Sequence, residues 1–356
     1  MNRDRILDIV KGIAITAIVI GHLPRVGIVK RDYEMDVNVA LLFFLQSFHI
    51  MVFFILAGDV VKKSWEKYSL RKFFEKRFCR LVIPYCSFVL LYALSIIIYN
   101  YISVILGQIP LYYRITPGNI LRALIMSNEP YLSRMGGFGF FWFFPPYFLC
   151  NIIFFIILNI KREALRIPLL LCILPALFFS LTKMLQHSYF PWGINIAFVV
   201  LPLMWVGTQY ETIKRLLQKI KHHGLIMVMI AVHLSIILLF CPYIVLANCY
   251  TSSYVFFYVL AILGFSWVLL AAVNIVDLPL GNVFACIGRY TLPIYAMHMI
   301  VINYAGLLKD YAYGSYAVSF GSLVLIFVLS IVMPIIVTSK IIEKNRVLNF
   351  LFLGSA

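Results

Sequence analysis

The run ILDIVKGIAITAIVIGHL occupies residues 6–23 and is apolar except for a few polar and charged positions. Its length is close to the roughly 20 residues that an α-helix needs to cross the hydrocarbon core of a bilayer. At about 100° per residue, Asp8, Lys11 and His22 fall on one face of that helix. Ionisable side chains inside a membrane span are costly, so they usually face the bundle interior and serve transport or chemistry. The run therefore predicts a first transmembrane helix with an acid, a base and an imidazole on one stripe.

The composition extends this interpretation to the whole chain, because 63% of its 356 residues are hydrophobic and only 12% are charged. Apolar runs of about 20 residues recur between short polar breaks, which is typical of membrane helices and not of the roughly 10-residue alternating strands of a membrane barrel. The sequence predicts an all-α, polytopic membrane helical bundle. Its ten expected spans are 6–23, 37–61, 81–105, 139–160, 167–182, 193–210, 225–247, 254–276, 290–307 and 316–339.

The lysine and arginine residues predict the orientation of these spans, because cytoplasmic flanks are enriched in them. With the N-terminus inside, 22 of the 30 basic residues fall on cytoplasmic flanks, and eight of those lie in segment 62–80. Both termini are therefore expected in the cytoplasm. Lys11 interrupts the apolar run, whereas the apolar region of a signal peptide is uninterrupted. The run is therefore expected to remain in the mature protein as its first helix. Residues 1–340 are predicted to form one transmembrane domain, and 341–356 a short cytoplasmic tail.

The net charge of +16 raises the question of nucleic acid, but the basic residues lie on membrane flanks with no soluble domain beside them. Anionic lipid or an anionic cofactor is the better expected partner, and no nucleic acid is expected. The seven cysteines are scattered without a CxxC pair, and the histidines form no HxxxH or HExxH set. No metal site is predicted. Cys241 and Cys249 flank an outer loop and would be bridged only if that loop folds back.

Two interpretations of the first stripe remain open. In one, Asp8 and Lys11 neutralise each other as an i, i+3 pair and His22 caps the outer end of the helix. In the other, Gly12 and Gly21 let a second helix or a ligand approach closely. Lys11 and His22 would lie about 16 Å apart along the helix axis. A long flexible donor from the cytoplasm would then pass Lys11 and reach His22.

Segment 62–80 carries the second candidate site. Its basic density fits a cytoplasmic loop that lies on anionic headgroups. A more local interpretation starts from Lys76 and Arg80, which are i, i+4 neighbours with Arg77 beside them. One helical turn then presents a cationic face on which arginine can contact phosphate in bidentate fashion. A nucleotide or a coenzyme with phosphate groups would dock there.

Three further residues are candidates for binding a substrate. His49 and His298 each lie in an apolar helix, where a histidine is usually a hydrogen-bonded bundle residue. Trp142 lies in the aromatic run 141–147, at the outer start of the fourth span, where an aromatic belt is expected. Two prolines there favour a broken helix start beside a cavity, and aromatic faces could stack on a sugar ring. The interval 106–138 is predicted to be an irregular outer lid or acceptor-facing loop.

These segments resemble the acyltransferase-3 family of integral-membrane O-acyltransferases over nearly the whole chain. In the first helix of that family, ten residues separate a basic residue from a histidine, as they separate Lys11 from His22. Many members have arginine at the basic position. The Lys-Gly pair found here resembles the sugar O-acetylase branch, in which it is common. Ala57-Gly58-Asp59 departs from the usual Ser-Gly plus aromatic. The other matching blocks are Ser47-Phe48-His49 with Phe53-Phe54, Arg77 and Arg80 before Pro84-Tyr85, Trp142-Phe143, and Ile287-Gly288-Arg289 through Tyr295 and His298.

The resemblance implies ten core helices in a bacterial inner membrane, with acetyl-CoA or another acyl-CoA as donor substrate and no permanently bound cofactor. The acceptor would be a hydroxyl of a surface glycan or lipid-linked sugar at the opposite face. His22 would deprotonate that hydroxyl or relay the acyl group, with Asp8 and Lys11 fixing the entrance. The expected coenzyme A ligands are Lys76, Arg77 and Arg80, and the expected acceptor-positioning residues are His49, Trp142 and His298.

Two alternatives to an acyltransferase remain at this stage. A transporter or flippase of a lipid-linked glycan would line its passage with the same buried charges and carry out no covalent chemistry. No inverted repeat is evident in the sequence, which weakens that alternative. In a noncatalytic membrane scaffold, the buried polar residues would be structural.

Overall fold

The computed structural model describes residues 4–23, 37–107, 115–126, 137–185, 190–220, 222–240, 244–246, 250–251, 253–306 and 316–355. These residues form helices apart from turns and one antiparallel ribbon of β1 (Ile244–Val245) and β2 (Tyr250–Thr251). The predicted all-α membrane bundle is confirmed. Cys241 and Cys249 lie outside the described residues.

The first half of the chain contains α1 (Arg5–His22), α2 (Val37–Gln46), α3 (Met51–Trp65), α4 (Leu70–Arg77), η2 (Phe78–Val82), α5 (Ile83–Ile105), α6 (Pro117–Ile125), η3 (Phe138–Phe143), α8 (Phe144–Leu158), α9 (Glu163–Pro168), η4 (Leu169–Ile173) and α10 (Leu174–Met184). The second half contains η5 (Pro191–Gly193), α11 (Ile194–Val199), α12 (Leu201–Gly207), α13 (Tyr210–Ile220), α14 (His223–Phe240), α15 (Tyr254–Ile275), α16 (Pro279–Arg289), α17 (Thr291–Gly306), α19 (Tyr316–Val337), η7 (Thr338–Ile342) and α20 (Arg346–Leu353).

Among the described residues, seven helices are long and apolar enough to cross a membrane, or eight if α16 and α17, bent by 82°, count as one span. The ten spans and the cytoplasmic termini stay predictions. Several helices lie outside the ten predicted spans, among them α4, α6, α13, α16 and α20. The helix α16 precedes the ninth predicted span, and α6 lies within the interval 106–138 that was expected to be irregular.

Segment 62–80 is also more helical than expected for a loop. Ser69 caps α4 by accepting a hydrogen bond from the backbone N–H of Lys72 at 3.5 Å. From there the helix continues through the π-helical turn η2 into α5, a single helix of 36 residues over Leu70–Ile105. Pro84 does not end this helix, because it lies at the first turn of α5, directly after the wider turn η2. Five basic residues of this segment therefore lie on one continuous helix: Arg71, Lys72, Lys76, Arg77 and Arg80.

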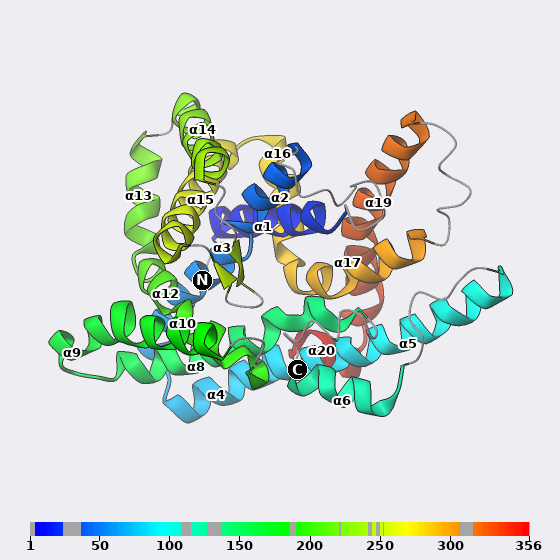
Figure 1. Ribbon diagram of the computed structural model, residues 1–356, viewed down its shortest axis with the longest axis horizontal. Coiled ribbons are helices and arrows are strands. Elements are labelled where there is room, and N and C mark those ends of the chain that lie inside the picture. Colours follow the sequence, from blue (N-terminus) through cyan, green and yellow to red (C-terminus); the bar gives the residue numbers. More distant parts are fainter. Residues whose placement is uncertain are drawn as a thin grey trace.

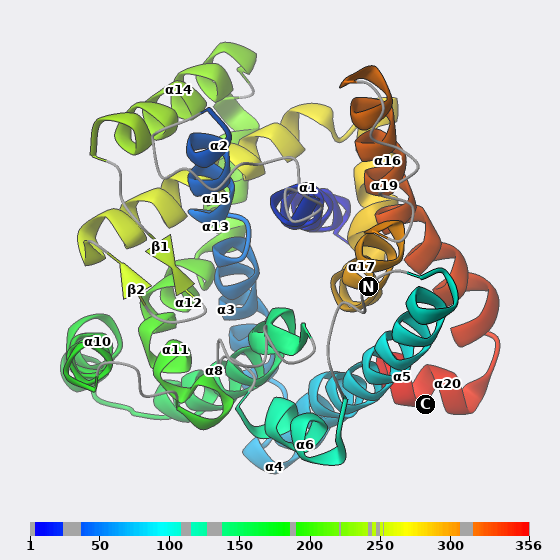
Figure 2. The ribbon, with the colours of Figure 1, turned by 45° about the vertical axis from the view of Figure 1, so that its right-hand side comes forward.

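The helix α1 lies inside the bundle, with α15, α16 and α17 around it (Figures 1 and 2). It packs most closely along α16, and two glycines make that contact tight. A Cβ at Gly12 would collide with the backbone carbonyl of Phe284, and one at Gly288 with that of Asp8. The close approach expected at Gly12 is thus observed, and its partner is a helix. Around Gly21 the described residues leave open space.

We therefore expect Gly288→Ala to destabilise the protein. The added methyl group would collide with backbone atoms of α1, which cannot move aside as a side chain can. The two helices must therefore separate, at a cost in stability of about 1–3 kcal/mol or more. The melting temperature in detergent, followed by tryptophan fluorescence, should fall by several degrees. Gly21→Ala is the matched control in α1, and an equal fall in both variants would contradict the packing argument.

Candidate functional site

A cavity of about 540 Å³ lies between α1, η2, η3, α16, α17 and η7. Four cationic side chains line it from elements that are far apart in the sequence: Lys11, Arg77, Arg80 and Arg289. The ring of Phe73, 5.1 Å from Cζ, packs against the Arg77 guanidinium. One acidic side chain, Glu343, also lines the cavity, so the four cations leave a net positive charge in a partly enclosed space, which favours an anionic ligand.

The first turn of α17 adds to this positive environment. Tyr290, Thr291, Leu292 and Pro293 line the cavity where α17 begins, directly after the 82° bend from α16. The N-terminal turn of a helix carries N–H groups without intrahelical partners and the positive end of the helix dipole. Arginine side chains beside such a turn form a suitable environment for phosphate groups.

One stripe of α1 forms the wall that leads away from these cations. Lys11, Ile15 and Ile18 line the cavity at successive turns, and His22 is the next residue on the same stripe. Asp8 lies one turn before Lys11, with 4.0 Å between Oδ1 and Nζ; its side chain is 4% exposed against 29% for Lys11. The structure therefore keeps Asp8 in the helix packing and turns Lys11 toward the cavity.

At the far end of this stripe, His22 meets His298 of α17. The two ring centroids are 4.9 Å apart and the rings meet edge to face. The Nδ1 atom of His22 bonds to the carbonyl oxygen of Ile18 at 2.8 Å, and that of His298 to Tyr295 at 2.7 Å. A carbonyl oxygen only accepts hydrogen bonds, so each Nδ1 carries the proton. In the neutral rings, each Nε2 then carries the lone pair that a base or a nucleophile needs.

Aromatic side chains form the remaining wall between the cations and the histidines. Phe143, Phe144, Tyr147 and Tyr295 line the cavity, and the Tyr295 hydroxyl donates to the backbone carbonyl of Phe140. The Phe140 ring lies 5.7 Å from the ring of His298. The short helix η3 thus links the cavity wall to the histidine pair. Most of this wall is apolar, as expected for a site that excludes water from a reacting centre.

Six of the nine predicted site residues lie outside the cavity lining of the described part of the chain. Asp8 pairs with Lys11, and His22 and His298 contact each other beyond Ile18; the other three lie against aromatic rings. Lys76 extends over the ring of Tyr68, with Nζ 3.9 Å from its centroid. Trp142 is half-buried and packs edge-on against Phe143, 6.2 Å away. His49 is buried beside Phe48. The structure thus brings Lys11, Arg77 and Arg80 together in one cavity lining, and it pairs Asp8 with Lys11 and His22 with His298.

A second buried histidine carries a network that the sequence analysis did not identify. Trp267 Nε1 donates to His233 Nδ1 at 3.3 Å, and His233 Nε2 lies 2.7 Å from Ser47 Oγ. Because Nδ1 accepts, Nε2 carries the proton and donates to the serine, whose hydroxyl donates to the Phe44 carbonyl at 2.7 Å. The histidine therefore donates a hydrogen bond to the serine oxygen and does not accept the serine proton. It cannot act as the base that would activate a serine nucleophile. This network therefore fixes α2, α14 and α15 together.

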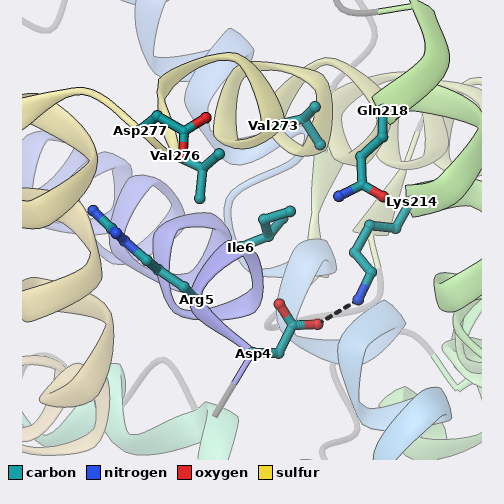
Figure 3. Close-up of a pocket in the computed structure, with 8 residues that line it drawn as sticks. All are labelled: Asp4, Arg5, Ile6, Lys214, Gln218, Val273, Val276 and Asp277. Atoms are coloured by element: carbon teal, nitrogen blue, oxygen red, sulfur yellow. Dashed lines mark hydrogen bonds and ion pairs between the residues drawn. The ribbon is translucent and has the colours of Figure 1, made fainter. Parts of the chain in front are cut away.

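A second hollow, of about 530 Å³, lies around the start of α1 (Figure 3). Its charges are committed to internal pairs. Lys214 of α13 forms ion pairs with Asp4 at 2.6 Å and with Glu211 at 2.7 Å. Asp4 also caps α1 by accepting a hydrogen bond from the backbone N–H of Leu7 at 3.2 Å. Arg5 donates to Asn282 of α16. The hollow thus anchors the first turn of α1 to α13 and α16.

The ion pairs of this anchor predict a pH dependence of stability. The hydrogen bond from Lys214 holds the pKa of Glu211 below its ordinary value. Burial lowers the pKa of Lys214, but its hydrogen bonds to Asp4 and Glu211 outweigh burial and raise it. The stabilisation by Glu211 is therefore complete above the ordinary glutamate pKa of about 4.3 and is lost as the pH falls through the lowered folded-state value.

We expect Glu211→Gln to lower the melting temperature at pH 7 and the difference from the natural protein to shrink as the pH falls below about 4. Melting curves in detergent at a series of pH values measure that difference. Glu66→Gln, which changes an exposed glutamate, controls for general charge effects. A difference that is constant with pH would show that Glu211 acts through packing and not through its charge.

The helical bundle, with cationic side chains lining an internal cavity, defines an integral-membrane protein. The chain matches the acyltransferase domain over residues 4–341 and belongs to the acyltransferase-3 family. It is therefore a membrane acyltransferase, and the family resemblance inferred from the sequence motifs is confirmed. No curated protein and no solved structure matched the chain.

Sequence reasoning missed two contributors to the site. Arg289 was given only as a basic flank of a span and as part of the Ile287-Gly288-Arg289 block of the family resemblance, with no role in ligand binding. Tyr147 was one member of an aromatic run, and nothing in that run separates cavity-lining rings from packing rings. The α16–α17 bend would have indicated Arg289, because a cation between two helix segments lies beside the free N–H groups of the second.

Proposed function

We propose that this acyltransferase transfers an acetyl or other acyl group from cytoplasmic acyl-CoA to a hydroxyl of a surface glycan or lipid-linked sugar in a bacterial inner membrane. The observation that carries the proposal is the cavity in which four cations lie beside the α1 stripe of Lys11, Ile15 and Ile18; the same stripe continues beyond the cavity lining to the His22–His298 pair. Covalent transfer, and not transport, follows from the family to which the chain belongs.

The donor binds through its phosphates in this proposal. Arg77, Arg80, Arg289 and Lys11 supply the charge, and the first turn of α17 supplies backbone N–H groups. The pantetheine arm extends along Ile15 and Ile18, whose side chains are apolar like much of the arm. The roughly 16 Å from Lys11 to His22 lets a long, narrow arm deliver a thioester from one end of the stripe to the other.

The reaction then occurs at His22. Its Nε2 lone pair takes the proton of the acceptor hydroxyl while the hydroxyl oxygen attacks the thioester carbonyl. The carbon–sulfur bond breaks, and the coenzyme A thiolate leaves and is protonated. His298, edge-on to His22, holds the ring in position, and the acceptor approaches from the end of the stripe opposite the cations. The same lone pair could instead accept the acyl group first and pass it to the hydroxyl.

Radiolabelled acetyl-CoA tests the proposal with purified protein in detergent. With a hydroxyl-bearing glycan acceptor, label should move to the acceptor and free coenzyme A thiol should appear in equal amount. Without acceptor, label that stays on the protein and is lost in His22→Ala would assign the relay role, and unlabelled protein would assign the base role. Acceptor that remains unlabelled across lipid-linked and free glycans would contradict the proposed acceptor class.

A further inference from the structure

The C-terminal segment lies beyond the region shared with the family, which ends at residue 341. It was expected to be a short cytoplasmic tail, but α20 packs against η2, α5 and η7 (Figures 1 and 2). Asn345 caps it by accepting hydrogen bonds from the N–H groups of Val347 and Leu348 at 2.9 and 3.1 Å. Phe352 packs edge-on against Phe88 of α5, with ring centroids 5.0 Å apart. We call residues 346–355 the C-terminal clamp.

The end of the clamp packs directly against the backbone at Arg80. Gly354 adopts a left-handed conformation with φ of 62°. A Cβ at this position would collide with the carbonyl oxygen of Cys79 and with the Cα of Arg80. Only glycine satisfies both conditions, because side chains disfavour positive φ and there is no room for a methyl group. The contact therefore fixes the chain end directly against η2.

The clamp also forms part of the cavity wall. Leu353 and Ser355 line the cavity together with Arg80, and Thr338 of η7 lines it from the preceding segment. Both η2 and η7 are π-helical turns, a feature frequent at functional sites because the wider turn redirects side chains. The clamp packs against both turns. The clamp thus supports the π-helical turn η2, from which the Arg80 side chain reaches the cavity.

We infer that the C-terminal clamp is a positioning element of the donor site, which aims Arg80 at the phosphates of the acyl-CoA and closes the cavity beside them. This inference rests on the proposed function. The clamp lies outside the region matched by the family, so donor affinity in this chain depends on residues that the family match does not cover.

The test measures the Kd of coenzyme A by calorimetry with full-length protein in detergent. Gly354→Ala, which forces the clamp off η2, should raise the Kd about 10-fold, the loss expected for about one charge-assisted hydrogen bond. Phe352→Ala releases the clamp without changing a backbone preference and should act in the same direction. Gly118→Ala, at an open position in α6, is the matched control and should bind normally.

A double-mutant cycle with Arg80→Gln separates positioning from general stability. If the clamp acts through Arg80, Gly354→Ala should add little to the Kd of Arg80→Gln. Additive effects would overturn the positioning role, and so would an unchanged Kd in Gly354→Ala and Phe352→Ala when the natural protein binds. Natural protein that fails to bind coenzyme A would overturn both this inference and the proposed donor, which distinguishes the two failures.

Discussion

His22→Ala is expected to reduce acyl transfer roughly 10²–10⁴-fold, the range for removal of a general base. The side chain lies on the α1 stripe one turn beyond Ile18, and its Nδ1–H bond to the Ile18 carbonyl places the ring's lone pair on Nε2. Acyl content of the surface glycan and the amount of glycan exported should be measured in the same cells. His223→Ala, which removes an exposed histidine at the start of α14, is the matched control.

The two cellular measurements separate chemistry from transport. Loss of acylation with normal export supports the proposed reaction. Normal acylation with lost export would favour a glycan transporter, and no change in either would make His22 an end cap of α1. Lys11→Arg should be far milder than His22→Ala, because it keeps the positive charge and restores the residue that is common in the resembling family.

The double substitution of Arg77 and Arg80 by glutamine should weaken coenzyme A binding about 10²–10⁴-fold, since each charge-assisted hydrogen bond contributes about 1.5–3 kcal/mol and two are lost. Glutamine leaves no new buried charge, so the protein should remain folded and inserted. Isothermal calorimetry on purified protein gives the Kd. Lys76→Gln is the matched control for this double substitution.

Lys76 lies on the same helical turn, but its ammonium stacks on Tyr68 and not in the cavity. The sequence alone groups it with Arg77 and Arg80, whereas the structure separates it from them. We therefore expect Lys76→Gln to bind coenzyme A almost normally. Equal weakening by Lys76→Gln and the arginine substitutions would indicate a diffuse surface attraction, and unchanged affinity in all variants would leave this helix a contact only for lipid.

The fold class was predictable because apolar runs of span length report directly on the bilayer that surrounds them. The His22 stripe was predictable for a similar reason, since helical periodicity fixes which residues of α1 share a face. The meeting of His22 with His298 was not, because residues 276 positions apart are joined only by the packing of α1 against α17. The break between α16 and α17 was also missed, since a bend of 82° depends on tertiary contacts as well as on Tyr290 and its neighbours.

The glycine crossing of α1 and α16 has a consequence for ligand binding. Gly12 directly follows Lys11, and Gly288 directly precedes Arg289, so two of the four cavity cations lie next to the glycine contacts between the two helix backbones. Neither helix backbone can move without breaking its contact with the other helix. A ligand that bridges Lys11 and Arg289 therefore meets preorganised charges and bears little of the ordering cost that flexible cations would impose.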